Sequence, residues 1–183
     1  MKKFELTTES ITFLGRTLFR IKALISFGNV KAGELGGYIE KEGNLSHEGD
    51  AWVCDNARVY GDAWVCGDAR VYGDAWVCDN AWVCGDARVY GDARVCGNAW
   101  VCDNARVCGN ADIATISGFG SEYRTTTFFR TKNNEIAVKC GCFYGTLAEF
   151  REKVKETHGD NRYAKEYLMI ADLMEMHFRG EEE

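Results

Sequence analysis

The chain reads AWVCDN-ARVYGD-AWVCGD over residues 51–68, and the same six-residue unit continues without insertion to Asn110. Each of the ten copies is Ala, then Trp or Arg, then Val, then Cys or Tyr, then a pair drawn from Gly, Asp and Asn. An unbroken period of six residues is typical of a parallel β-helix, in which each unit forms one wall of a coil. Because no loop interrupts the repeat, few places remain for a catalytic group, and we expect a scaffold or a binding protein.

Alternation within each unit predicts which side chains point inward. Ala and Val stand two positions apart, so in an extended strand both point to the same side, and their small or β-branched side chains suit a narrow interior. The Trp or Arg and the Cys or Tyr then point outward. The Gly, Asp and Asn pairs suit the corners because these residues tolerate positive φ or bond their own backbone.

The repeat resembles the hexapeptide-repeat, left-handed β-helix family of bacterial proteins, known from acyltransferases and γ-class carbonic anhydrases. The family motif is an aliphatic residue followed four places on by a small one, as in Val59 and Ala63. The resemblance implies three hexads, or 18 residues, per coil. With 45–50 as a degenerate leading hexad and 111–116 as a trailing one, we expect four coils with a stack height of roughly 19 Å.

Positions 18 apart should lie above one another, which predicts three outward faces. The tryptophan face carries Trp64, Trp82 and Trp100, with Cys66, Cys84 and Cys102 beside them. The arginine–tyrosine face carries Trp52, Arg70, Arg88 and Arg106, with Cys54, Tyr72, Tyr90 and Cys108 beside them. The third face carries Arg58, Trp76, Arg94 and Asp112, with Tyr60, Cys78, Cys96 and Ala114 beside them.

Two of these faces suggest functions. The tryptophan face is apolar, and exposed strips of this kind usually mark an interface, so we expect a homo-oligomer, preferably a trimer, or a cover made by the chain's own terminal segments. On the arginine–tyrosine face, Arg70, Arg88 and Arg106 offer forked donors for phosphate or carboxylate, and Tyr72 and Tyr90 offer flat rings for a base. The alternative is that these arginines neutralise the corner Asp residues and keep the face soluble.

Composition narrows the possible function classes further. The chain has 183 residues and a net charge of −6 with no basic cluster, so we expect no nucleic-acid partner. It shows no long apolar run and no signal peptide, which predicts a cytoplasmic protein without membrane contact. In that reducing compartment the nine Cys should be free thiols. Cys140-Gly-Cys142 is too small a set for zinc, so we predict no metal and no cofactor.

The two ends of the repeat should be capped. Residues 1–44 predict a small β cap, with short strands at 3–6, 11–14 and 17–24, a turn at 7–10, and a tight turn at the Gly36-Gly37 pair. Residues 117–183 predict an α+β unit that consists of a hairpin around 132–135 and two helices. Thr146 and Glu149 form a capping box for the first helix, and Asp160 starts the second. The last residues, Glu181–Glu183, read as a solvated tail. The fold class is therefore mainly β, with the β-helix over 45–116.

The layout also resembles a group of uncharacterised hexapeptide-repeat proteins from bacteria, prophages and phages. The stretches that carry this resemblance are RIKAL at 20–24, GGYIE at 36–40, the Ala-x-Val-x-Gly-Asp repeats, and CGCFYGT at 140–146 together with 153–160. No established activity comes with this resemblance. Some phage proteins of this size sequester bacterial immune nucleotides in oligomeric pockets, which makes a nucleotide a reasonable ligand class.

Three function classes are left. A hexapeptide acyltransferase uses a catalytic His at a coil edge. Here His47 is the single histidine near the coils, and the hexad pattern places its side chain toward the core. We therefore expect no catalytic residue and no enzyme. The favoured reading is an oligomeric binding protein that sequesters a small anionic nucleotide. Arg124 and Arg130 on the C-terminal hairpin, beside Thr125–Thr127, are further candidate ligand residues. A structural or partner-docking scaffold without a small ligand is the alternative.

Overall fold

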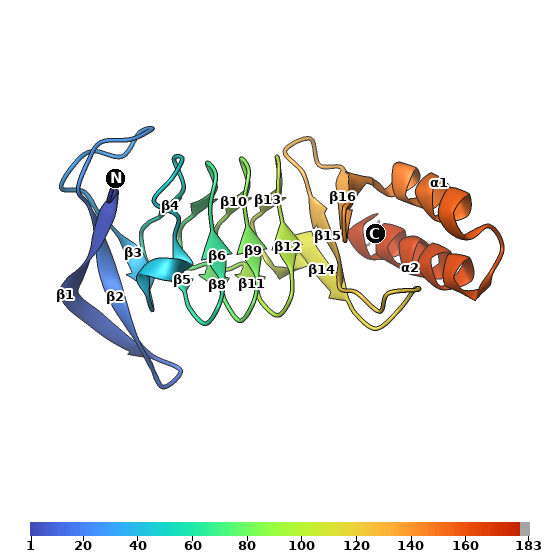
Figure 1. Ribbon diagram of the computed structural model, residues 1–183, viewed down its shortest axis with the longest axis horizontal. Helices are drawn as coiled ribbons and strands as arrows, with labels where there is room; N and C mark the ends of the chain where they lie inside the picture. Colours follow the sequence, from blue (N-terminus) through green and yellow to red (C-terminus); the bar gives the residue numbers. More distant parts are fainter. Residues whose placement is uncertain (180–183) are drawn as a thin grey trace. The chain divides into compact units, whose positions relative to one another are not determined.

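The computed structural model describes residues 1–179. The chain divides after Asn110 into a repeat unit and a C-terminal unit, which are described separately below (Figure 1). The predicted tail Glu181–Glu183 lies outside the described residues. Within residues 1–179, no helix combines the length and apolar character needed to cross a bilayer.

The repeat unit is a β-solenoid whose rungs are two-residue strands, each made of the outward Trp or Arg and the inward Val of one hexad (Figure 1). The rungs are β4 (Trp52–Val53), β5 (Arg58–Val59), β6 (Trp64–Val65), β7 (Arg70–Val71), β8 (Trp76–Val77), β9 (Trp82–Val83), β10 (Arg88–Val89), β11 (Arg94–Val95), β12 (Trp100–Val101) and β13 (Arg106–Val107). They form three parallel sheets, β4-β7-β10-β13, β6-β9-β12 and β5-β8-β11. Each rung pairs with the rung 18 residues away, as Trp64 does with Trp82, so the predicted three-hexad coil is confirmed.

The interior of the solenoid is made of the Ala and Val of every hexad. All of these residues from Ala51 to Val107 are buried, with at most 1% of their surface exposed. Backbone hydrogen bonds run from rung to rung, for example from the Trp64 amide to the Ala81 carbonyl at 2.9 Å. The corners turn at residues with positive φ, either Gly, as at Gly85 (65°), or Asp, as at Asp103 (55°), because these residues accept the left-handed conformation. The predicted inside and outside of the repeat are confirmed.

The N-terminal cap is a hairpin that continues one face of the solenoid. It consists of β1 (Phe4–Phe13), β2 (Arg16–Ala23) and β3 (Leu35–Ile39), and β3 pairs in parallel with β5, so the order of this sheet is β1-β2-β3-β5-β8-β11. The predicted turn at 7–10 is wrong. The backbone stays extended there, and an irregularity between Leu6 and Ser10 absorbs the change of register against β2.

The Gly36-Gly37 pair is also not a tight turn, because both residues lie inside β3. A Cβ on Gly36 would lie 2.5 Å from the Val53 carbonyl oxygen and 2.5 Å from Cγ1 of Ile21. A Cβ on Gly37 would lie 2.7 Å from the Ala57 carbonyl oxygen. The pair is therefore needed for the close approach of the cap to the first coil.

The start of the solenoid differs from the predicted phase. A short 3-10 helix, η1 (Glu42–Asn44), precedes it, and the buried Asn44 amide donates to the carbonyls of Gly61 (3.1 Å) and Ala63 (2.8 Å). Leu45 forms a β-bridge with Val65 and so occupies the position that Val has in the later hexads. The predicted hexad 45–50 assigns that position to His47, two residues further along the chain. These side-chain hydrogen bonds replace the backbone partners that a further coil would supply.

His47 is consequently not in the core-facing slot predicted for it. Its side chain is half-buried and stacks on Phe4, with the ring centroids 4.3 Å apart. Its Nδ1 atom accepts a hydrogen bond from the Lys3 amide at 3.2 Å. His47 thus fastens the N-terminal strand to the first coil.

A second 3-10 helix, η2 (Asn110–Asp112), spans the boundary between the two units, and the C-terminal unit then forms an antiparallel sheet in the order β14-β15-β16-β17. The strands are β14 (Ile113–Ile116), β15 (Thr126–Arg130), β16 (Ile136–Cys140) and β17 (Phe143–Thr146). The predicted trailing hexad at 111–116 is wrong, because β14 pairs antiparallel with β15. Thr115 and Ile116 stand where a hexad needs corner residues, so the coil cannot turn and the chain leaves the solenoid after Asn110.

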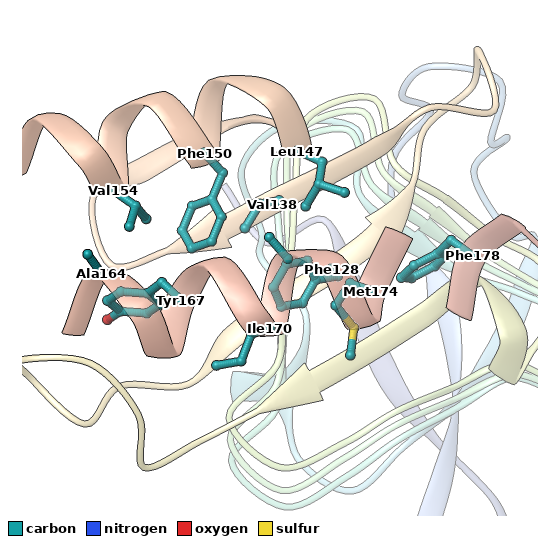
Figure 2. Close-up of a cluster of buried hydrophobic side chains, with 11 residues drawn as sticks. Phe128, Val138, Leu147, Phe150, Val154, Ala164, Tyr167, Ile170, Met174 and Phe178 are labelled. Atoms are coloured by element: carbon teal, nitrogen blue, oxygen red, sulfur yellow. The ribbon is translucent and has the colours of Figure 1, made fainter. Parts of the chain in front are cut away.

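Two helices, α1 (Leu147–His158) and α2 (Arg162–Arg179), cover this sheet, and their apolar stripes meet as predicted. The predicted capping box is present, with the Thr146 hydroxyl accepting from the Glu149 amide and the Glu149 carboxylate accepting from the Thr146 amide. Figure 2 shows Phe150 and Tyr167 facing each other between the helices, over Phe128 of β15.

Candidate functional site

The arginine–tyrosine face has the predicted register. Arg88 pairs with Arg70 on one side and Arg106 on the other. The rings of Tyr72 and Tyr90 stack face to face, with centroids 5.0 Å apart and planes 4° apart. Burial raises the pKa of Tyr72 above its usual range, which keeps its hydroxyl neutral. Each tyrosine ring therefore already uses one of its faces on the other ring.

Acidic side chains surround this face. The corners on either side of its columns carry Asp50, Asp55, Asp68, Asp74, Asp86, Asp92 and Asp103. Seven carboxylates thus accompany three arginines and Lys3, which interacts with Asp50 and Asp68, so the local charge is unfavourable for an anion. This arrangement agrees with the alternative reading, in which the arginines offset the corner charges.

The arginines of this face also differ from one another. The Arg106 guanidinium donates to the backbone carbonyls of Asp86 (3.1 Å) and Ala105 (2.7 Å). The Arg70 guanidinium and the Asp50 carboxylate both border Gly28. A Cβ on Gly28 would lie 3.1 Å from Nη2 of Arg70 and 2.9 Å from Oδ2 of Asp50. Arg88 is exposed. The three guanidinium groups therefore have different surroundings, although their rungs are in register.

Arg130, a candidate from the C-terminal hairpin, has a structural role. It forms an ion pair with Asp112 at 3.2 Å and donates to the Asn134 side chain at 3.0 Å. It also donates to the backbone carbonyl of Phe178 and so ties the end of α2 to the sheet. Each of its three nitrogen atoms therefore has a partner inside the C-terminal unit, which makes it a weaker candidate for ligand binding than Arg124.

Arg124, the other candidate from this region, lies at a pocket within the C-terminal unit. The pocket has a volume of about 200 Å³. It is lined by Arg124, Cys140, Cys142, Phe143, Phe150, Lys153, Val154, Thr157, His158 and Tyr167. The Arg124 guanidinium lies against Gly141, where a side chain would collide with it, and Gly141 takes a positive φ of 56°. The positive φ is the reason that this turn between β16 and β17 favours glycine, because the flexible guanidinium could move aside for a side chain.

Aromatic rings form the walls of this pocket. Phe150 packs against Phe143 and edge-on against Tyr167, with both centroid distances 5.6 Å (Figure 2 labels Phe150 and Tyr167). The His158 ring stacks on Tyr167 at 5.8 Å with the planes 28° apart. Burial, followed by the neighbouring Cys140 thiol, raises the pKa of Tyr167 to about 12. Its hydroxyl is therefore a neutral hydrogen-bonding group and not a base near neutral pH.

Two cationic side chains stand at the rim of the pocket. Arg124 pairs with Glu122 at 3.4 Å, and Lys153 pairs with Glu156 at 2.8 Å. The bond to Glu156 raises the pKa of Lys153, which keeps it charged. All four of these side chains are about half-exposed or more, and such exposed pairs contribute little to stability. An incoming anion can therefore exchange with either carboxylate at small cost.

The prediction that all nine cysteines are free thiols is wrong. Cys78 and Cys96 form a disulfide. They are rung neighbours on the third face with a Cα–Cα distance of 4.7 Å, which lies within the range that a disulfide spans. Together with Asp79 they place three donor atoms within 4.8 Å, fewer than the four ligands that structural zinc takes.

Comparison with known proteins supports the architecture. The family described as YdcK Beta solenoid repeat matches residues 51–67, 63–79, 81–97 and 87–103. The chain carries a β-solenoid repeat. All four matches lie inside the repeat unit, so they concern the coils and not the pocket. No curated protein matches the chain.

Reasoning from the sequence missed most of the pocket. Lys153 and His158 were not singled out, and Tyr167 was assigned to the helix core alone. Most of the lining residues come from two segments, CGCFYGT at 140–146 and the stretch 153–160. The structure brings these two segments together around one cavity.

Proposed function

We propose that this protein is a non-catalytic binding protein that sequesters a small anionic ligand with an aromatic ring, a nucleotide being the preferred class. The site is the pocket of the C-terminal unit. The observation that carries the proposal is the combination of aromatic walls from Phe143, Phe150 and Tyr167 with Arg124 and Lys153 at the rim. Pockets for small molecules are typically apolar with a few polar groups that fix orientation.

The division of roles follows from the chemistry of a nucleotide. The base would enter the apolar pocket beside the His158 and Tyr167 rings, where aromatic contacts contribute about 0.5–1.5 kcal/mol beyond buried area. The phosphate would meet the Arg124 guanidinium, whose planar fork suits phosphate oxygens. Lys153 would supply a second charge from α1. The arginine–tyrosine face is a poorer site because acidic columns flank it.

Thermal unfolding with fragment probes tests this proposal, since a ligand that binds the folded state raises its melting temperature. Inorganic phosphate, a nucleoside and the matching nucleotide would each be added, over a panel of linear and cyclic nucleotides. We expect a nucleotide to raise the melting temperature more than either fragment. Lys153→Ala should reduce the shift, and Lys132→Ala, an exposed charge outside the pocket lining, should not. A flat panel, or a response to phosphate alone, would contradict the proposal.

We also propose that the tryptophan face is covered by further copies of the chain, in a homotrimer. Trp64 and Trp82 are 37% and 41% exposed, although they stack edge to face in a continuous column with Trp100. Apolar strips of this kind are unusual on a free surface. Light scattering of wild type and Trp82→Glu tests this point: wild type should be trimeric and the variant monomeric. A monomeric wild type at micromolar concentration would refute the assembly and leave the ligand proposal intact.

A further inference from the structure

A column of three thiols runs along the tryptophan face. Cys66, Cys84 and Cys102 follow the rungs β6, β9 and β12, which pair in register, so successive Cα atoms are about 4.8 Å apart. The Cys84 thiol interacts with Cys66 on one side and with Cys102 on the other. Cys66 and Cys84 are half-buried and Cys102 is buried. We call this set the thiol ladder.

The indole ring of Trp100 contacts the centre of the ladder. Its Nε1 donates a hydrogen bond to the Cys84 sulfur at 3.2 Å. An N–H donor stabilises a sulfur that carries negative charge, as a metal-bound thiolate does. Trp64, Trp82 and Trp100 also form the neighbouring column, so the indoles lie beside the sulfurs over its whole length.

The other two faces show that this arrangement is particular to the tryptophan face. On the third face, Cys78 and Cys96 are rung neighbours but are joined by their disulfide. On the arginine–tyrosine face, Cys54 and Cys108 are separated by the two stacked tyrosines. Cys108 is therefore a thiol of the same repeat position without a sulfur on the next rung.

We propose that the thiol ladder is a binding site for a monovalent soft cation of the Cu(I) or Ag(I) class, held between the sulfurs of two neighbouring rungs. Thiolates select such ions, which accept low coordination numbers. Each bound ion replaces the protons of two thiols, so two protons are released and no electron is transferred. Cys84 belongs to both possible pairs. Zinc fits less well, because a pair of rungs supplies two sulfurs and zinc takes four ligands.

The sulfur donors of the ladder favour an ion with a strong preference for sulfur. Thiolates are soft ligands, whereas hard cations such as Mg²⁺ prefer oxygen ligands. The ladder therefore discriminates against hard cations.

Silver is the probe of choice, because Ag(I) undergoes no redox cycling under these conditions. The full chain, with the Cys78–Cys96 disulfide intact, would be titrated with Ag(I) in an excess of free methionine, a thioether that competes for silver without exchanging with the disulfide. Retained silver and quenching of tryptophan emission would both be measured. We expect at least one retained Ag(I) per chain, the same for Cys108→Ser, and loss of both signals for Cys84→Ser.

Two further variants show whether silver retention needs a pair of neighbouring thiols or only a single thiol. Cys66→Ser leaves the Cys84 and Cys102 pair and should retain silver, whereas the double variant C66S/C102S leaves Cys84 alone and should not. The double variant also provides the test if Cys84→Ser fails to fold. Silver retention and quenching in folded Cys84→Ser or in the double variant would overturn the proposal. Absence of retained silver in wild type would do the same.

Discussion

Replacing Val83 by Asp tests the packing of the solenoid where it should be most sensitive. Val83 lies in the middle rung of its sheet, between Val65 and Val101, and all three residues are completely buried. An Asp there either carries an unpaired charge or becomes protonated. A neutral polar group buried without a hydrogen bond costs roughly 2–7 kcal/mol. Loss of the buried valine adds about 1.5–3 kcal/mol.

The total, roughly 4–10 kcal/mol, is comparable to the whole stability of a typical domain, about 5–15 kcal/mol. Val83→Asp should therefore unfold the repeat unit or make the protein insoluble. Val83→Ala keeps the site apolar and removes two carbon groups at ~0.8 kcal/mol each, plus a cavity term, so we expect about 2 kcal/mol. Asp86→Asn, at an exposed corner, should cost less than about 0.5 kcal/mol.

Tryptophan emission during urea unfolding is a suitable assay, because all five tryptophans lie in the repeat unit. The signal therefore reports the solenoid and not the C-terminal helices. The expected order of unfolding midpoints is wild type and Asp86→Asn together, then Val83→Ala, then Val83→Asp. Equal midpoints for Val83→Asp and Asp86→Asn would refute the reasoning that the Val column forms a sealed interior.

Three further predictions follow from particular contacts. Gly36→Ala should destabilise the repeat unit by about 1–3 kcal/mol, because its Cβ would lie 2.5 Å from backbone oxygen; the control Gly43→Ala, with no atom within 4 Å of its Cβ, should not shift the urea midpoint. Arg130→Met should cost the C-terminal unit about 1.5–3 kcal/mol through the lost bonds to Asp112 and the end of α2, measured as helix loss by circular dichroism on heating; an unchanged transition would show that these bonds contribute nothing. At pH 8 the exposed Cys108 should react with iodoacetamide far faster than Cys66, whose pKa of about 11 against an ordinary 9.0 lowers its thiolate population about hundred-fold. The rate at Cys66 should rise with pH up to about 11, and equal rates at pH 8 by peptide mass spectrometry would contradict this assignment.

The coils could be predicted from the sequence almost completely, because the repeat leaves only one consistent register. Inward Val83, outward Trp82 and the pairing of Arg70 with Arg88 all follow from alternation and a spacing of 18 residues. The two ends could not be predicted as well. At Leu45 the phase shifts by two residues because η1 precedes the first coil, and at Ile116 an absent corner ends the solenoid one hexad early.

The candidate site was harder to predict, because its members come from four segments that meet only in the folded unit. Arg124 was named for its charge alone, and nothing in the local sequence places it against Gly141. Tyr167 stands on the apolar face of a helix, where core packing is the ordinary interpretation. The Cys78–Cys96 disulfide does not follow from composition, which favours free thiols, but from the rung spacing that brings the two sulfurs together.

The most direct test of the proposed function compares the two candidate sites by calorimetric titration of the nucleotide that gives the largest thermal shift. Arg124→Ala removes the guanidinium at the pocket, and Arg88→Ala removes one from the arginine–tyrosine face. A lost charge-assisted hydrogen bond costs about 1.5–3 kcal/mol, so Arg124→Ala should weaken binding roughly ten- to hundred-fold. Arg88→Ala should leave the affinity unchanged. The reverse result, an unchanged Arg124→Ala and a weakened Arg88→Ala, would place the ligand on the solenoid and contradict the assignment of the pocket.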